Sequence, residues 1–74
     1  MAWPVIRGSG GARKARAARG SRGKSGGVRI IYYAMTRRGV VHLIDAYAKS
    51  EKEDLTDAET REIRELIETL EAQE

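Results

Sequence analysis

Two β-rich segments separated by four residues constrain the fold of this chain more than any other feature. Residues 28–35 read Val-Arg-Ile-Ile-Tyr-Tyr-Ala-Met, and residues 40–48 read Val-Val-His-Leu-Ile-Asp-Ala-Tyr-Ala. β-branched and aromatic residues dominate both segments, as is typical of strands. The connection Thr-Arg-Arg-Gly ends on Gly39, a residue that turns favour. The pattern therefore predicts an antiparallel hairpin.

The first of these segments also shows where its strand lies in the sheet. Alternation puts Arg29, Ile31 and Tyr33 on one face and the residues between them on the other. Both faces are largely apolar, so we expect a central strand with a neighbour on each side. Tyr32 and Tyr33 point oppositely, so one of the two is expected to join the core and the other not.

A candidate for the second neighbour is residues 12–17, Ala-Arg-Lys-Ala-Arg-Ala, which lie between two glycine-rich loops. The alanines allow a short helix. The segment can equally be an edge strand, because lysine and arginine are common on protected sheet edges. The short length and the flanking glycines favour the strand.

The C-terminal region predicts an amphipathic helix. Thr56 and Glu59 have the spacing of a capping box. An apolar stripe follows at helical spacing, formed by Ile63, Leu66, Ile67 and Leu70. The stripe needs a partner, and the hairpin offers one. We therefore predict an α+β fold, a small antiparallel sheet of about three strands packed by the C-terminal helix. Residues 1–74 form a single domain, in which residues 1–11 can be flexible.

Charge is distributed very unevenly along the chain. Residues 1–38 hold ten Lys or Arg and no acid, whereas residues 39–74 hold four Lys or Arg and eleven Asp or Glu. A basic half of this kind indicates a polyanionic partner. The alternative is a disordered basic tail beside a solvated acidic helix.

Several kinds of site are excluded by composition. The chain has no cysteine and one histidine, His42, so thiolate and multi-histidine metal sites are ruled out. Gly23-Lys24-Ser25 resembles the end of a phosphate-binding loop, but position 18 is alanine and a strand follows, not a helix. We therefore expect neither a metal nor a cofactor. Apolar runs are far shorter than the roughly 20 residues that span a bilayer, and no secretory signal is visible, so we expect no membrane partner and a cytoplasmic protein.

Aromatic and basic residues alternate in a way that suits RNA. Arg29 and Tyr33 share one strand face, and Tyr47 and Lys49 share a face of the next strand. A hairpin can bring these faces together, so that bases stack on rings and phosphates pair with cations. The alternative is that the tyrosines are simply core. Further basic residues near this surface are Arg13, Lys14, Arg16, Arg22 and Lys24.

Three stretches in order resemble the RelE/HigB family of type II toxins. They are Gly-Lys-Ser-Gly-Gly-Val-Arg-Ile-Ile-Tyr-Tyr at 23–33, Tyr-Ala-Lys-Ser-Glu-Lys-Glu-Asp-Leu-Thr at 47–56, and the basic segment at 6–16. The resemblance implies a ribosome-dependent mRNA endoribonuclease that needs no metal, inhibits translation and is neutralised by an antitoxin. Its partners would be mRNA on the ribosome and that antitoxin.

The resemblance also implies roles for individual residues. Arg29 matches the arginine of the family's central strand and is expected to stabilise the transition-state charge, with Lys49, Lys14 and Arg16 as helpers. The implied RNA-binding set is Arg13, Arg22, Lys24, Tyr33, Tyr47 and Lys52. Some family members carry a catalytic tyrosine or arginine just after the last strand. Ser50 and Thr56 stand there in this chain, so that role is empty or falls to Tyr47 or Lys52.

The chain also departs from the family at its start. Members usually begin with a helical hairpin, which this sequence lacks, so it looks N-terminally truncated. The alternative function is therefore a catalytically inactive remnant that only binds RNA or antitoxin. The acid and base of any cleavage reaction stay open at this point.

Overall fold

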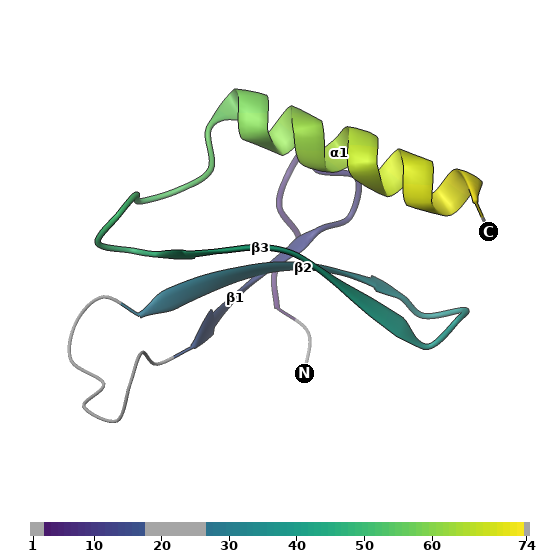
Figure 1. Ribbon diagram of the computed structural model, residues 1–74, viewed down its shortest axis with the longest axis horizontal. Coiled ribbons are helices and arrows are strands. Elements are labelled where there is room, and N and C mark those ends of the chain that lie inside the picture. The colour runs from purple at the N-terminus through teal and green to yellow at the C-terminus, as the bar shows by residue number, and fades with distance from the viewer. Residues whose placement is uncertain (1–2, 18–26, 74) are drawn as a thin grey trace.

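The computed structural model of the chain describes residues 3–17 and 27–73. Three strands, β1 (Arg13–Ala17), β2 (Val28–Met35) and β3 (Val40–Ala48), are followed by one helix, α1 (Asp57–Ala72). The helix lies across one face of the sheet, as Figure 1 shows. The predicted α+β fold and all four predicted elements are confirmed, and residues 13–17 take the strand alternative.

The sheet is antiparallel with the order β1-β2-β3, so β2 is central as predicted. Arg16 lies opposite Arg29, and Arg29 lies opposite Tyr47 on β3. Residues directly opposite one another point to the same face of a sheet. The register therefore lines up side chains of β1, β2 and β3 in rows across the sheet. Basic residues that are far apart in the sequence become neighbours in this way.

A bulge interrupts the pairing of β2 with β3. Ile31 pairs with Asp45 but the next residue, Tyr32, pairs with Leu43, which leaves Ile44 as an extra residue on β3. A bulge of this kind redirects side chains locally. Ile44 packs against the core on the helix side, where Asp45 also lies.

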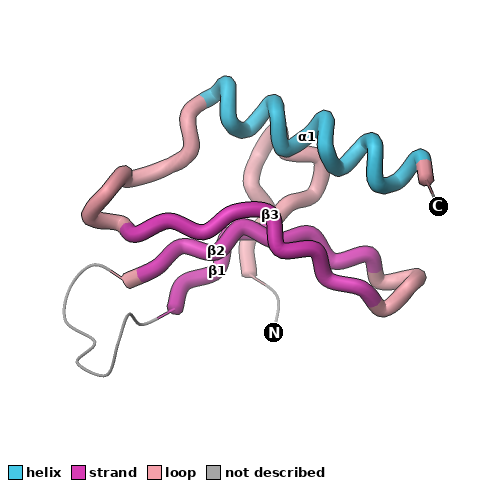
Figure 2. The backbone as a smooth tube through the Cα atoms, viewed as in Figure 1, coloured by secondary structure: helices cyan, strands magenta, loops and turns pink. Residues whose placement is uncertain are grey.

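Helix α1 begins with the predicted capping box. The Thr56 hydroxyl accepts from the backbone N–H of Glu59 at 3.1 Å, and the Glu59 carboxylate accepts from the backbone N–H of Thr56 at 2.9 Å. Ile63 and Ile67 are buried against the sheet, while Leu66 stays exposed. Figure 2 shows the resulting two layers, with the helix on one side of the three strands.

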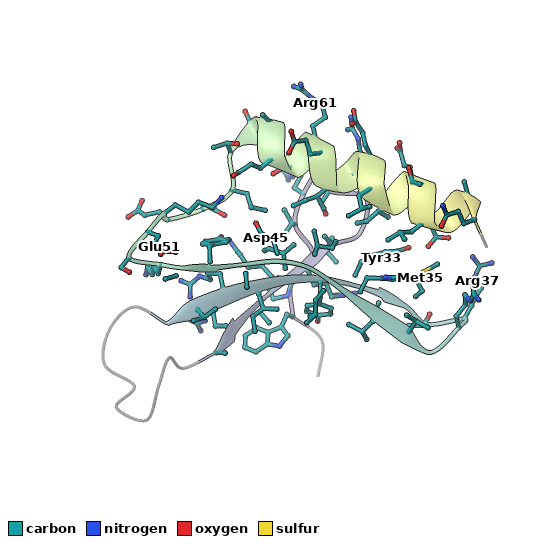
Figure 3. The ribbon with its side chains drawn as sticks, in the orientation of Figure 1. Tyr33, Met35, Arg37, Asp45, Glu51 and Arg61 are labelled. Atoms are coloured by element: carbon teal, nitrogen blue, oxygen red, sulfur yellow. The ribbon has the colours of Figure 1, made fainter. Side chains whose placement is uncertain are left out.

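The core lies between these two layers. Its buried residues are Ala12, Ile31, Tyr47, Ile63 and Ile67. Of the two neighbouring tyrosines, Tyr33 packs against this core, and Figure 3 shows it between sheet and helix together with Met35.

The loop before β1 also packs under the helix. The buried Ser9 hydroxyl accepts from the Ala12 N–H at 2.9 Å and donates to the Ile6 carbonyl at 2.7 Å. Gly11 has a φ of +117°, and an added Cβ would lie 3.2 Å from the Tyr33 ring. Glycine is therefore needed at position 11 both for the backbone conformation and for the close approach of the ring.

The opposite face of the sheet is apolar and has no helix over it (Figures 1 and 2). Arg13 pairs with Tyr32 there, and it is the one charged residue that the three described strands place on that side. Leu43 is 76% exposed and Val41 is 58% exposed. Antiparallel sheets usually alternate apolar and polar residues when one face meets water, so this face differs from an ordinary solvated one.

Candidate nucleic-acid interface

Three cationic side chains lie close together on the helix-facing side of the sheet, at the end that the core does not reach. Arg16 on β1 lies directly opposite Arg29 on β2, and Lys14 lies one row further along β1. They line a hollow of about 290 Å³ together with Trp3 and Pro4. The β1–β2 register thus produces the hollow, because alternation keeps Lys14 and Arg16 on one face.

The pairing of Arg16 with Arg29 is unusual for a sheet. Like charges directly opposite one another on neighbouring strands are destabilising. The described residues provide neither arginine with an ion pair. An anion held between the two guanidinium groups would relieve this repulsion, so the hollow is suited to a phosphate group.

Trp3 supplies an aromatic wall that the sequence did not predict. The extended N-terminal segment runs beside β1, where the Lys14 N–H donates to the Pro4 carbonyl at 3.3 Å and the Arg13 guanidinium donates to the Trp3 carbonyl. Trp3 is 39% exposed and lines the hollow next to the cations. A single tryptophan outside any strand or helix carries no periodic signal, and its role in the site could not be found from spacing alone.

Tyr47 lies on the same row as Arg29 and Arg16, at the edge of the core. It is only 7% exposed, and the Lys52 Nζ lies 5.0 Å from the centre of its ring, in the geometry of a cation–π contact. Burial raises the pKa of the phenol. The positive charges of Lys14, Lys52 and Arg29 oppose this rise, and the Asp54 carboxylate adds to it.

The segment between β3 and α1 places carboxylates beside the site. Asp54 Oδ1 lies 3.0 Å from Lys14 Nζ, and Glu59 Oε2 lies 2.6 Å from Lys52 Nζ. The hydrogen bond from Lys14 lowers the pKa of Asp54, and that from Lys52 lowers the pKa of Glu59. The Glu59 contact in turn raises the pKa of Lys52. Both lysines are therefore already held by internal acids when no RNA is present.

The structure brings together part of the predicted site. Lys14, Arg16, Arg29 and Tyr47 share one side and one end of the sheet, and Lys52 reaches the Tyr47 ring. Lys49 lies exposed just past the end of β3, and its N–H donates to the Gly27 carbonyl at 3.1 Å.

The other predicted residues are elsewhere. Arg13 belongs to the opposite face, and Tyr33 lies under α1, where its hydroxyl donates to Glu71. Arg22 and Lys24 are outside the described residues. The hollow therefore depends on Lys14, Arg16 and Arg29, with Trp3 in addition.

The arrangement is suited to binding a nucleic-acid backbone. Three cations can neutralise phosphates, and an exposed indole can stack on a base. Among residues 3–17 and 27–73, no three His, Cys, Asp or Glu side chains come close enough to share a metal ion. Within the same part of the chain, no helix has the length and apolar character that crossing a bilayer requires.

A comparison with known protein families covers most of the chain. Residues 7–74 match the family model described as the RelE toxin of the RelE/RelB toxin-antitoxin system. The match includes all three strands and the helix, and every described residue of the hollow except Trp3 and Pro4. The chain therefore belongs to the RelE family of toxins from toxin-antitoxin systems.

Proposed function

We propose that this toxin inhibits translation by cutting mRNA on the ribosome, as an endoribonuclease whose chemistry comes from the side chains of the hollow. The observation that carries the proposal is the cross-strand pair of Arg16 and Arg29, with Lys14 beside it and no ion pair from the described residues to either arginine. Strands hold this pair in place, so the charges are positioned before RNA arrives.

The reaction that suits these groups is attack by a ribose 2′-hydroxyl on the adjacent phosphorus. Negative charge then accumulates on the phosphate oxygens, and preorganised cations stabilise it. We assign this role to Arg29, with Lys14 and Arg16 as helpers and Lys49 nearby at the end of β3. Trp3 can hold a neighbouring base by stacking.

Membership of the RelE family implies an antitoxin partner. We propose that an acidic segment of the antitoxin covers the cations of the hollow and so competes with mRNA. The Asp54 carboxylate already forms an ion pair with the Lys14 ammonium, which is the kind of contact that an antitoxin carboxylate would make. Action on ribosomes would place the toxin in the cytoplasm.

The test is a reconstituted translation reaction to which the purified chain is added, with mRNA cuts mapped by primer extension. We expect cuts within translated codons, fewer by about 100-fold with Arg29→Ala, which is the typical loss when one preorganised donor is removed. Arg61→Ala is the matched control, because Arg61 projects from α1 away from the sheet (Figure 3). Equal cutting by Arg29→Ala and the wild type would reject the assignment of Arg29.

The second candidate is a module that binds RNA or antitoxin without cutting. It is favoured by the same charges, since binding needs only the cations and the indole. It predicts salt-sensitive RNA binding with no cuts in the translation reaction. That outcome, from a chain shown to be folded, would replace the nuclease proposal.

A further inference from the structure

The sheet face opposite α1, which we call the bare face, is apolar and has no described element packed against it (Figure 2). Its apolar residues on β2 and β3 include Val28, Ile30, Tyr32, Ala34, Val41 and Leu43. Val5 extends the face, because Val5 pairs with Arg13 and Arg13 pairs with Tyr32. Leu43 is 76% exposed, Val41 is 58% exposed and Val5 is 52% exposed. Contiguous exposed apolar surface of this kind marks an interaction site.

The bare face carries very little charge. Arg13 is the one charged residue that the described strands place on it, and its guanidinium already donates to the Trp3 carbonyl. Interfaces between different proteins gain specificity from complementary charges on the two sides. The bare face offers no such pattern, whereas an identical apolar face complements it in a twofold dimer.

The dimensions of the bare face indicate which kind of layer fits it. The three strands and the segment paired at Val5 form rows about 4.8 Å apart, so the face is about 19 Å wide. The eight residues of β2 give it a length of about 26 Å. A single helix is about 10 Å across and would cover only half of this width. A second sheet has the matching width, and apolar sheet faces pack on one another about 10 Å apart.

The area of the bare face suits a reversible contact. About 500 Å² on each of two copies gives about 1,000 Å² in total, which is near the lower limit for a specific interface. Contact along the open edge of β3 is a poorer alternative, because the bulge at Ile44 interrupts that strand. The observations therefore favour face-to-face packing over edge-to-edge pairing.

We propose that two copies of this chain associate through their bare faces as a β-sandwich dimer, with a dissociation constant of about 10–100 μM. Leu43 and Val41 become buried in this dimer. The Arg13 charge lies on the surface that is covered and weakens the association, because burying a charge without a partner is costly.

The dimer leaves the hollow of each copy accessible. Lys14, Arg16 and Arg29 lie on the helix-facing side of the sheet, so the two hollows point away from the interface. The inference is therefore independent of the proposed nuclease function. RNA affinity per copy should be the same in the monomer and in the dimer.

Sedimentation equilibrium of the purified chain, from well below to well above the expected dissociation constant, tests the proposal. The wild type should change from monomer to dimer and grow no further. Leu43→Lys places a charge in each half of the interface and should raise the dissociation constant by about 10-fold or more. Leu66→Lys is the matched control, because Leu66 is an exposed leucine of α1, and it should leave the constant unchanged. Arg13→Leu removes the charge of the face and should lower the constant by about 10-fold.

Folding and association are separable by protein concentration. Circular dichroism below the dissociation constant checks that each variant folds as a monomer. Leu43 is exposed there, so Leu43→Lys should fold. Val41→Lys repeats the test at a second exposed position of the face if Leu43→Lys does not fold.

Three results would overturn the proposal. A chain that stays monomeric at the highest concentration would leave the bare face to a different partner, such as the antitoxin. A dimer that survives Leu43→Lys and is lost with Leu66→Lys would place the interface on the helix. Growth beyond the dimer would mean a head-to-tail contact between different surfaces.

Discussion

The two ends of the helix-facing side of the sheet differ in character although the same strands build both. At the covered end, Ile31 and Tyr33 of β2 pack against the core beneath α1, and the Tyr33 hydroxyl bonds Glu71. At the open end, Arg29 of the same strand faces Arg16, and the Tyr47 hydroxyl is left without a described partner.

This difference separates stability from chemistry along a single strand. The covered end satisfies its polar groups and excludes water, as stabilising regions do. The open end keeps like charges together and a polar group unsatisfied, which costs stability and creates affinity for an anion. Natural proteins accept such local costs at functional sites.

The largest expected effect is at the covered end. Ile31 is fully buried, so Ile31→Ala should lower the free energy of unfolding by about 2–5 kcal/mol, as cavity-forming substitutions do. Leu43→Ala on the bare face is the matched control and should change it by less than about 0.5 kcal/mol. Urea unfolding checks both variants. A small effect at Ile31 would contradict the assigned core.

The next effect is at the open end and should leave the fold intact. Arg29→Ala removes one of two facing like charges, so its free energy of unfolding should equal or slightly exceed that of the wild type, by up to about 0.5 kcal/mol. Its affinity for single-stranded RNA should fall, and the slope of log K against log salt should become shallower by about 0.7. Calorimetry and a salt titration measure the two quantities. If Arg29→Ala were less stable than the wild type and bound RNA equally well, Arg29 would serve the stability of the fold and not RNA binding.

A further prediction compares the two tyrosines directly and concerns stability alone. Tyr33→Phe removes a charge-assisted hydrogen bond to Glu71 and should cost about 1.5–3 kcal/mol. Tyr47→Phe removes an unsatisfied group and should cost nothing. Denaturant unfolding of both variants and the wild type measures the free energy of unfolding that each substitution costs. Equal costs would mean that Tyr47 has a structural partner after all.

The smallest expected effect is at the Lys14–Asp54 pair. Its hydrogen bond lowers the pKa of Asp54 in the folded state, so the associated stability is present above the ordinary pKa and is lost as pH falls through the lowered one. The pair is exposed, so Asp54→Asn should cost less than about 1 kcal/mol at pH 7, and progressively less as pH falls through the lowered pKa. Unfolding curves across this pH range measure the difference. If the stability difference between Asp54→Asn and the wild type grew as pH fell, folding would not lower the pKa of Asp54.

Much of the fold could be predicted from the sequence because its signals are local. Periodicity and turn residues indicated the hairpin, and the capping box marked the start of α1 to the residue. Alternation placed Arg29 with Ile31 and Tyr33 on one face, and the structure shows that this face is the helix side. The bulge at Ile44 could not be predicted, because it depends on how β3 fits the helix and leaves no pattern of its own.

The candidate site was predictable only in part. The sequence predicted that a hairpin can bring the faces of Arg29 and Tyr47 together, and the register pairs these two residues. Trp3 and Asp54 reach the site from irregular segments, whose paths depend on tertiary contacts. Residue type also did not distinguish Tyr33 from Tyr47, because only the three-dimensional partners of each hydroxyl do so.

The measurement that tests the central claim most directly is an NMR titration with a short RNA whose 2′-hydroxyl is methylated to prevent cutting. We predict the largest shifts at the Trp3 indole N–H and at the backbone amides of Lys14, Arg16 and Arg29, all at the open end. Shifts concentrated instead around Leu43 on the bare face or Arg61 on the helix, with the hollow unchanged, would contradict the account.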